Sequence, residues 1–377
     1  MIYLDNAATT KMRKECLEEI EKFSVECFYN PSALYKPALE AAKSLKEARR
    51  TLLELLGDTN GGLIFTASGT EADNLALFCA LKRKSGKIVV SEGEHAAVYN
   101  SALELRNRGY NVVCAPVKED GGVDMGTLEG LIDAETDLVS VMHVSNETGA
   151  VNPLSEIAGI IKRKSPHALF HSDGVQAFGK IPFNIKDLGV DMYSISGHKL
   201  HGPKGVGALY VKAGVNLKPV IYGGGQEGGV RSATENLAYI MAMKRAAELA
   251  YQNFEKRTAK LKALKGLYFD LLTKSIDNIK LISSKEGAPH ILTAAFYGVR
   301  GEVLLHALEK HGILVGIGSA CSSKKHSRFE RLLNLPEKWR EGIVRISLSE
   351  DNNEEEAGFV VEKIKEEYEL LKSIGRI

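Results

Sequence analysis

Short apolar runs alternate with longer helical patterns between residues 88 and 211, and this alternation restricts the fold more than any other feature. The runs occupy residues 88–90, 112–117, 138–143, 168–171, 192–195 and 206–211. Neighbouring parallel strands need a long crossover connection, usually a helix, so strands separated by helical segments indicate βαβ units. We expect an α/β fold in which helices cover both faces of a mostly parallel central sheet.

Four polar residues stand directly after strands of this predicted sheet, namely His95, Asn146, Asp173 and Lys199. In open α/β sheets, ligands bind beyond the carboxyl ends of the strands, so these side chains are candidates for one site. A lysine whose pKa is lowered can bond to a carbonyl carbon through its neutral amine. An acid such as Asp173 can keep the pyridine nitrogen of pyridoxal phosphate protonated. Taken alone, Lys199 could equally be a solvated lysine in a polar loop, and His95 a structural hydrogen-bonding residue.

A phosphate site is expected earlier in the chain. An apolar run at residues 63–66 leads into a turn, Ala67-Ser68-Gly69, and a helix that opens at Thr70. Glycine lets the backbone approach an anion, and the free amides at the start of a helix face it. The alternative is an ordinary helix cap made by Ser68.

Charge and composition exclude several classes of function. The formal net charge is +1, from 49 basic and 48 acidic side chains, which argues against direct nucleic-acid binding and against binding to an anionic membrane. No basic segment followed by an apolar one opens the chain, and eighteen consecutive apolar residues occur nowhere, so we expect a cytoplasmic protein. The five cysteines form no Cys-x-x-Cys pattern, so neither a disulfide framework nor a metal site is expected.

Segments spread over almost the whole chain resemble the cysteine desulfurases, which are class V aminotransferases of pyridoxal-phosphate fold type I. These segments follow the family's order: Tyr3-Leu4-Asp5-Asn6-Ala7-Ala8-Thr9-Thr10, Ser68-Gly69-Thr70-Glu71, Glu94-His95, Asn146-Glu147, His171-Ser172-Asp173, Ser196-Gly197-His198-Lys199, Gly223-Gly224-Gly225-Gln226-Glu227, Arg231-Ser232-Ala233-Thr234, Ser319-Ala320-Cys321 and Arg345-Ile346-Ser347.

The resemblance implies a set of site residues. The catalytic residues would be Lys199, Cys321 and His95. Asn146 and Arg345 would bind the substrate carboxylate, Arg345 through a bidentate ion pair. The cofactor, pyridoxal 5'-phosphate, would be bound by Gly69, Thr70, His95, Asn146, Asp173, Gln176, Ser196, His198, Lys199 and Thr234.

The resemblance also implies how the chain is organised. A large cofactor-binding domain would span residues 13–255, and residues 1–12 and 256–377 would form a smaller α+β domain that carries the Cys321 loop. The strongly helical residues 235–275 would connect them. Thr234 would reach the cofactor phosphate of a neighbouring subunit, so we expect a homodimer.

The activity implied is the conversion of L-cysteine to L-alanine, with the sulfur held as a persulfide on Cys321. An acceptor protein, either an iron-sulfur scaffold or a sulfur carrier for thiolation, would then receive it. Alternatives are a class V aminotransferase, a selenocysteine lyase, or a non-catalytic relative used as a scaffold. Three features depart from the family's usual pattern: Ser145 replaces an asparagine, Gly174 replaces an alanine, and the stretch after Cys321 is unusually basic.

Overall fold

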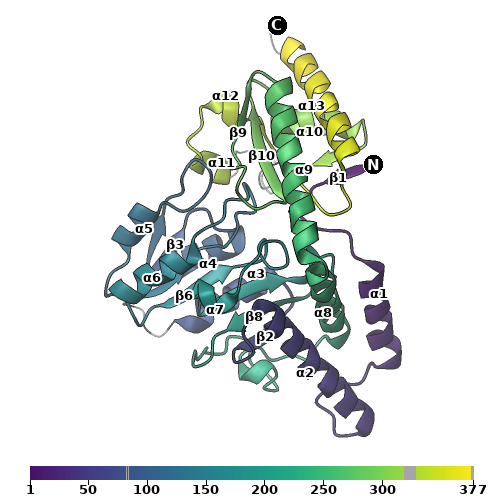
Figure 1. Cartoon of the computed structure of the whole chain (residues 1–377). Coiled ribbons are helices and arrows are strands. Elements are labelled where there is room, and N and C mark those ends of the chain that lie inside the picture. Colours follow the sequence, from purple (N-terminus) through teal and green to yellow (C-terminus); the bar gives the residue numbers. More distant parts are fainter. Residues whose placement is uncertain (82, 84, 318–327, 375–377) are drawn as a thin grey trace.

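A seven-stranded sheet lies at the centre of the computed structural model, which describes residues 1–81, 83, 85–317 and 328–374 (Figure 1). Its strand order is β2-β8-β7-β6-β5-β3-β4. Only β8 runs antiparallel to its neighbours in this sheet, and the other pairs are parallel, so the expected mostly parallel sheet is confirmed. The strands are β2 (Gly62–Thr66), β3 (Lys87–Ser91), β4 (Asn111–Ala115), β5 (Thr136–Ser140), β6 (Leu169–Asp173), β7 (Met192–Ser196) and β8 (Gly207–Val211).

Helices cover both faces of this sheet because its strands are apolar on both sides. In β3, Ile88 and Val90 pack on one face with α3 and α4, and Val89 packs on the other with α2, α5, α6 and α8. This division follows from the alternation of side chains along a strand. The helices of this region are α1 (Lys14–Glu21), α2 (Lys36–Leu56), α3 (Gly69–Ala80), α4 (Ala96–Asn107), α5 (Met125–Leu131), α6 (Leu154–Lys164), α7 (Ile185–Leu188) and α8 (Leu237–Tyr251).

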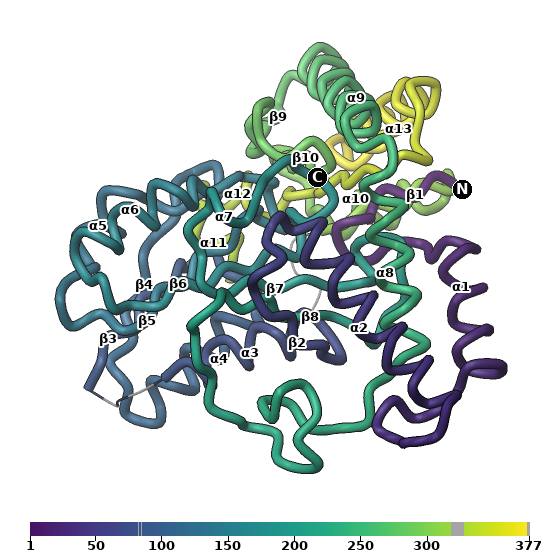
Figure 2. The backbone as a smooth tube through the Cα atoms, turned by 60° about the horizontal axis from the view of Figure 1, so that its bottom comes forward, coloured from purple at the N-terminus to yellow at the C-terminus, as the bar shows by residue number. Residues whose placement is uncertain are grey.

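A second, smaller body combines the start of the chain with its last third. The sheet β12-β10-β9 is antiparallel, and β1 pairs in parallel with β11 beside it. Helices α9 and α13 lie side by side on the outside of this body (Figure 2). Its elements are β1 (Ile2–Leu4), α9 (Phe254–Ser275), β9 (Ile279–Leu281), β10 (Ile291–Phe296), α10 (Gly301–Glu309), β11 (Ile313–Val315), α11 (Arg328–Leu332), α12 (Glu337–Arg340), β12 (Ile343–Ser347) and α13 (Glu354–Ile374).

The helical stretch 235–275 is two helices rather than one. Helix α8 ends at Tyr251 and α9 begins at Phe254, because Asn253 has a φ of 56° in the left-handed region that a helix interior does not tolerate. Asparagine visits this region more readily than most residues. The break lets α8 pack on the large sheet and α9 on the small one (Figure 1).

None of the helices in the described ranges is long and apolar enough to cross a membrane.

Candidate active site

A cavity of about 680 Å³ opens where the large sheet meets the smaller body. It receives residues from the ends of β6 and β7, from the starts of α3 and α4, and from β12. Its lining contains these residues predicted from the sequence: Gly69, Thr70, His95, Asn146, Asp173, Gln176, Ser196, His198, Lys199 and Arg345. Thr234 is exposed and does not line this cavity. Cys321 lies outside the described residues.

The start of α3 forms a cradle that fits a phosphate group. A Cβ atom added to Gly69 would stand 2.8 Å from Val175 Cγ2, so a larger residue would fill the space. Ser196 Oγ lies beside Gly69, buried and without a hydrogen-bond partner. The Ser68 side chain does accept a hydrogen bond from the Glu71 amide, so the ordinary helix cap is present too. The cap and the cradle coexist because they use different amides of the same helix end.

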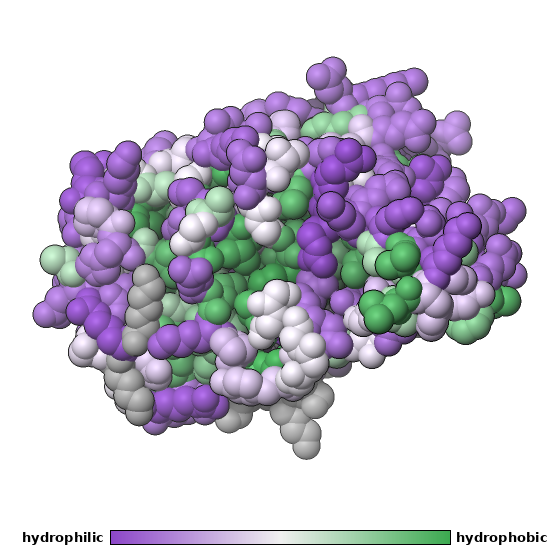
Figure 3. Space-filling view, turned by 90° about the horizontal axis from the view of Figure 1, so that it is seen from below, coloured by the Kyte–Doolittle hydropathy of each residue, from purple (hydrophilic) through white to green (hydrophobic). Residues whose placement is uncertain are grey.

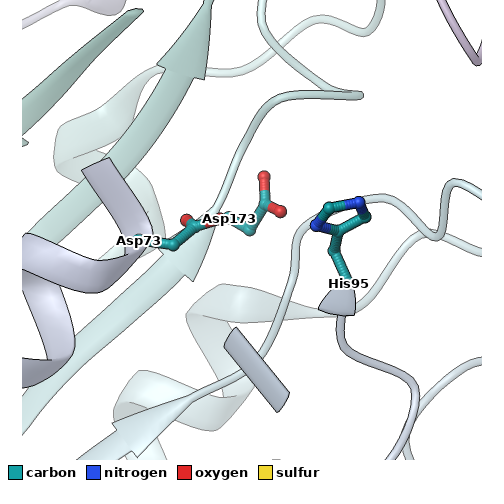
Figure 4. A group of neighbouring side chains, drawn as sticks. All are labelled: Asp73, His95 and Asp173. Carbon is teal, nitrogen blue, oxygen red and sulfur yellow. The ribbon is translucent and has the colours of Figure 1, made fainter. Parts of the chain in front are cut away.

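Asp173 ends β6 and lies between Asp73 and the His95 ring (Figure 4). Its Oδ1 accepts a hydrogen bond of 2.8 Å from the Val175 amide. Burial raises the pKa of Asp173, while His95 and Lys199 act in the opposite direction. A carboxylate in this position can bind the protonated nitrogen of a pyridine ring.

Asp73, His95 and Asp173 also place one ligand atom each within 4.8 Å of one another, a spacing that a metal ion can bridge. Burial and the nearby Asp173 raise the pKa of Asp73 well above its ordinary value, which favours the protonated form of this carboxyl group. A carboxyl group binds a cation in its deprotonated form. Asp173, in contrast, lies where its carboxylate can bind a protonated ring nitrogen.

His95 faces the cavity from the start of α4. Its Nδ1 accepts a hydrogen bond of 3.1 Å from the Ala97 amide, so His95 caps the helix. The His95 side chain therefore both caps helix α4 and lines the cavity.

Lys199 follows β7 in a short 3-10 turn, Gly197–Lys199, and its amine points to the N-terminal segment. Nζ donates hydrogen bonds of 2.5 Å to the Ala7 carbonyl and 2.7 Å to the Ala8 carbonyl. Burial, followed by the charge of Arg345, lowers the pKa of Lys199 to about 8. Part of the Lys199 population therefore carries a neutral amine near neutral pH. With its amine bound to two backbone carbonyls, Lys199 is not the solvated loop lysine of the alternative interpretation.

Arg345 reaches the cavity from β12 and is only 6% exposed, so it is not a surface arginine. Nη2 forms an ion pair of 3.0 Å with Asp5, and Nη1 donates a 2.7 Å hydrogen bond to the Asn146 carbonyl. Its Nε is buried without a partner. The Asn146 side chain donates to Glu147 Oε1 at 3.0 Å. The guanidinium is thus held in place with donor capacity left for a carboxylate.

Gln176 and His198 support the N-terminal segment in this structure. Gln176 Nε2 donates to the Ala7 carbonyl at 2.8 Å, and its Oε1 accepts from Lys180 Nζ at 2.9 Å. His198 Nδ1 lies 3.1 Å from Thr9 Oγ1. Burial and then Lys199 lower the pKa of His198 to about 4, so its imidazole is neutral.

Asp73, Glu94 and Arg328 are among the cavity residues to which the sequence interpretation gave no role. Burial raises the pKa of Glu94 to about 8, and its Oε1 accepts from the Met142 amide at 2.6 Å. Asp73 could have been found from the sequence, because it is an acidic residue among the mostly apolar positions of the helix that follows the phosphate cradle. Arg328 has no local signal, because its partners lie more than 200 positions away in the sequence.

Comparison with known proteins agrees with this geometry. The family described as "Aminotransferase class-V" matches residues 2–359. The chain belongs to the class V aminotransferases. Within this family it resembles a "Cysteine desulfurase IscS" from Clostridium botulinum, to which it is 38% identical over 96% of this chain and 92% of that protein. A "Cysteine desulfurase IscS" from Dictyoglomus turgidum is 36% identical over 99% and 96% of the two chains.

A solved structure named "NIFS-LIKE PROTEIN" superimposes with a TM-score of 0.91 at 33% identity, over 98% of this chain and 100% of that one. A second, "SspA in complex with cysteine", has a TM-score of 0.80 at 29% identity over 93% and 99%. The fold type I expected from the sequence is confirmed. This class V aminotransferase is a pyridoxal-phosphate enzyme of the cysteine desulfurase group, and the cradle at Gly69, the acid at Asp173 and the amine of Lys199 fit that cofactor.

Proposed function

We propose that this class V aminotransferase converts L-cysteine to L-alanine and passes the sulfur through a persulfide on Cys321 to an acceptor protein. The observation that carries the proposal is the convergence of Lys199, Asp173 and Arg345, from β7, β6 and β12, on one cavity. The relatives named cysteine desulfurase, and a solved relative named as a complex with cysteine, support L-cysteine as the substrate.

When bound, pyridoxal phosphate supplies an aldehyde that bonds to amino groups and a ring that accepts electrons from the substrate carbon. Asp173 keeps a proton on the ring nitrogen. Arg345 binds the substrate carboxylate through two parallel hydrogen bonds. Lys199, as a neutral amine, takes the proton from the substrate α-carbon and holds it for return.

The transfer of sulfur to Cys321 needs no external oxidant or reductant. The carbon–sulfur bond of the substrate breaks, and the thiolate of Cys321 forms a sulfur–sulfur bond with the departing sulfur atom. Cysteine and one enzyme thiol therefore give alanine and one enzyme persulfide. A thiol or an acceptor protein then takes up the outer sulfur atom.

The decisive experiment measures alanine and sulfide release from L-cysteine by the cofactor-loaded protein in the presence of a thiol reductant. Equimolar products are expected from the wild type, with none from Lys199→Ala and greatly reduced sulfide from Cys321→Ala. Cys114→Ala is the matched control, because Cys114 is a partly buried free cysteine on β4 that does not line the cavity. Release of alanine only when a keto acid is added would instead establish an aminotransferase.

We also propose that the enzyme is a homodimer in which Thr234 completes the site of the partner. Thr234 is exposed and absent from the lining of its own cavity. Large apolar side chains stand exposed in two loops, among them Leu34 at 92%, just before α2, and Tyr222 at 81%, directly before the glycine-rich loop at residues 223–229. Apolar side chains gather between polar ones on the lower face of the molecule, where α2 and the glycine-rich loop lie (Figure 3). Exposed apolar patches of this kind mark association surfaces.

The domain boundaries proposed are those expected from the sequence, residues 13–255 for the large domain and residues 1–12 with 256–377 for the small one. The separate apolar clusters on the two sheets support this division. A cytoplasmic location is proposed as well. The cysteines of the described chain, Cys16, Cys27, Cys79 and Cys114, are free, which suits a reducing compartment.

A further inference from the structure

Arg328 begins α11 and reaches across from the small body to the turn that carries His95. Its Nη1 donates to the Glu92 carbonyl and its Nη2 donates to the Glu94 carbonyl. The guanidinium also stacks on the Tyr99 ring of α4, with 3.9 Å between Cζ and the ring centroid. One side chain therefore contacts both arms of the turn between β3 and α4.

This turn determines where the His95 ring stands. Ser91 Oγ accepts from the Gly93 amide at 3.0 Å, and the Glu94 side chain is held by the Met142 amide. Arg328 binds the carbonyls on either side of Gly93, and the second of these belongs to the residue directly before His95. Without Arg328, the segment 92–95 would keep its internal hydrogen bond but lose these two hydrogen bonds to the small body.

Arginine suits this position for two chemical reasons. Its planar guanidinium offers donors in a fixed fork, so that it can bind two carbonyls at once, and it stacks on an aromatic ring. A lysine offers a point charge and cannot do both. The next residue, Phe329, is buried against Leu333 and Ile343 and fixes α11 to the small sheet.

We propose that Arg328 is a positioning residue that ties the small body to the Glu92–His95 turn and thereby sets the His95 ring opposite Asp173. Arg328 stands seven positions after Cys321 in the sequence. The inference rests on the proposed function in assigning the cavity to the cofactor and Cys321 to sulfur transfer.

The test measures pyridoxal phosphate binding to the apoenzyme, with no cysteine present. Arg328→Ala should raise the dissociation constant about tenfold, the lower end of the loss that follows removal of the supporting partner of a metal-binding side chain. Arg328→Lys should lose most of this affinity as well, because it keeps the charge but not the fork. Tyr99→Leu should give a smaller loss, because only the stacking contact disappears.

Arg331→Ala is the matched control, because Arg331 is an exposed arginine on the same short helix and does not line the cavity. It should bind the cofactor as the wild type does. The pH dependence of the bound cofactor's absorbance should also change in Arg328→Ala but not in Arg331→Ala. A purely structural role would lower the melting temperature of Arg328→Ala and leave its cofactor affinity and spectrum, at a temperature where it is folded, equal to those of the wild type. That result would overturn the proposal.

The two proposals fail separately in this design. If the wild type binds the cofactor but releases no alanine from cysteine, the desulfurase assignment fails while the affinity ratio between Arg328→Ala and wild type still stands. If alanine is released and Arg328→Ala binds the cofactor normally, the role of Arg328 fails alone.

Discussion

At the scale of single residues, the protonation state of Lys199 is decided by its neighbours. Burial and Arg345 lower its pKa to about 8, and Asp173, Asp5 and Glu147 act in the opposite direction. Each of these groups comes from a different segment of the chain, so the pKa is a property of the assembled cavity.

The first prediction concerns pH. Lys199 is mostly protonated below pH 8 and mostly neutral above it. Because the neutral amine is the form that bonds to an aldehyde, the rate at which the apoenzyme captures pyridoxal phosphate should rise with pH, with the midpoint of the rise near pH 8. Arg345→Gln removes a positive charge that lowers the pKa of Lys199, so it should move this midpoint upward. Asp173→Asn removes a negative charge and should move it downward. Stopped-flow absorbance at a series of pH values measures both, and equal midpoints in all three proteins would contradict this electrostatic account.

A second prediction concerns Gly174, where the family commonly has alanine. A Cβ at this position would lie 2.0 Å from ring atoms of Tyr193. The Tyr193 ring is held by a hydrogen bond of 2.8 Å between its hydroxyl and His143 Nδ1. Gly174→Ala should therefore lower the free energy of unfolding by about 1 to 3 kcal/mol, the usual cost of overpacking. Denaturant unfolding measures this change. The double variant with Tyr193→Leu should destabilise less than the two single changes added together, and strict additivity would show that the ring is not the obstacle.

At the scale of elements, the carboxylate of Glu227 attaches the glycine-rich loop to helix α2 through an ion pair and to strand β2 through a hydrogen bond. Glu227 has a left-handed backbone, and its carboxylate binds Arg49 of α2 in bidentate fashion at 2.8 and 2.9 Å. The same carboxylate accepts a 2.9 Å hydrogen bond from the Phe65 amide of β2. The strained conformation persists because these three contacts hold it.

The third prediction follows from this arrangement. The Glu227 side chain is 3% exposed, so Glu227→Ala leaves the Arg49 guanidinium without its carboxylate and the Phe65 amide without its carboxylate acceptor, and should lower the free energy of unfolding by about 3 to 5 kcal/mol. Glu54→Ala, which breaks an exposed pair with Arg50 on the same helix α2, should have little effect. Thermal and denaturant unfolding of both variants tests the difference, and similar losses would mean that the loop is held by other contacts.

At the scale of the whole molecule, the proposed dimer makes a prediction about mixed subunits. Lys199→Ala and Thr234→Val should each be inactive or nearly so as pure proteins. In a mixed dimer, one of the two sites combines Lys199 from the Thr234→Val chain with Thr234 from the Lys199→Ala chain, and this site is intact. The other site lacks both residues. Random reassembly of equal amounts should therefore restore activity at about a quarter of the sites. Absence of recovery, with mixed dimers verified by differently tagged chains, would show that Thr234 acts within its own chain.

Much of the fold could be predicted from the sequence because it depends on local patterns. Apolar runs separated by helical segments define the parallel sheet, and residues such as Asp173 and Lys199 stand directly after strands, where such sheets bind ligands. The break between α8 and α9 was not predicted, because both halves have helical composition and a single asparagine in a left-handed conformation separates them.

The sequence by itself therefore determined the α/β class, the positions of the candidate acid, amine and phosphate cradle, and the resemblance that led to the family. Only the tertiary structure decided that Arg345 is buried near Lys199, that burial and Asp173 raise the pKa of Asp73, and that Arg328 donates hydrogen bonds to the turn before His95. The physical reason is the separation in sequence of the residues that interact. Strand and helix patterns depend on neighbours within a few positions, whereas pKa values and ion pairs depend on charges that folding brings together from distant segments, such as Arg345 beside Lys199.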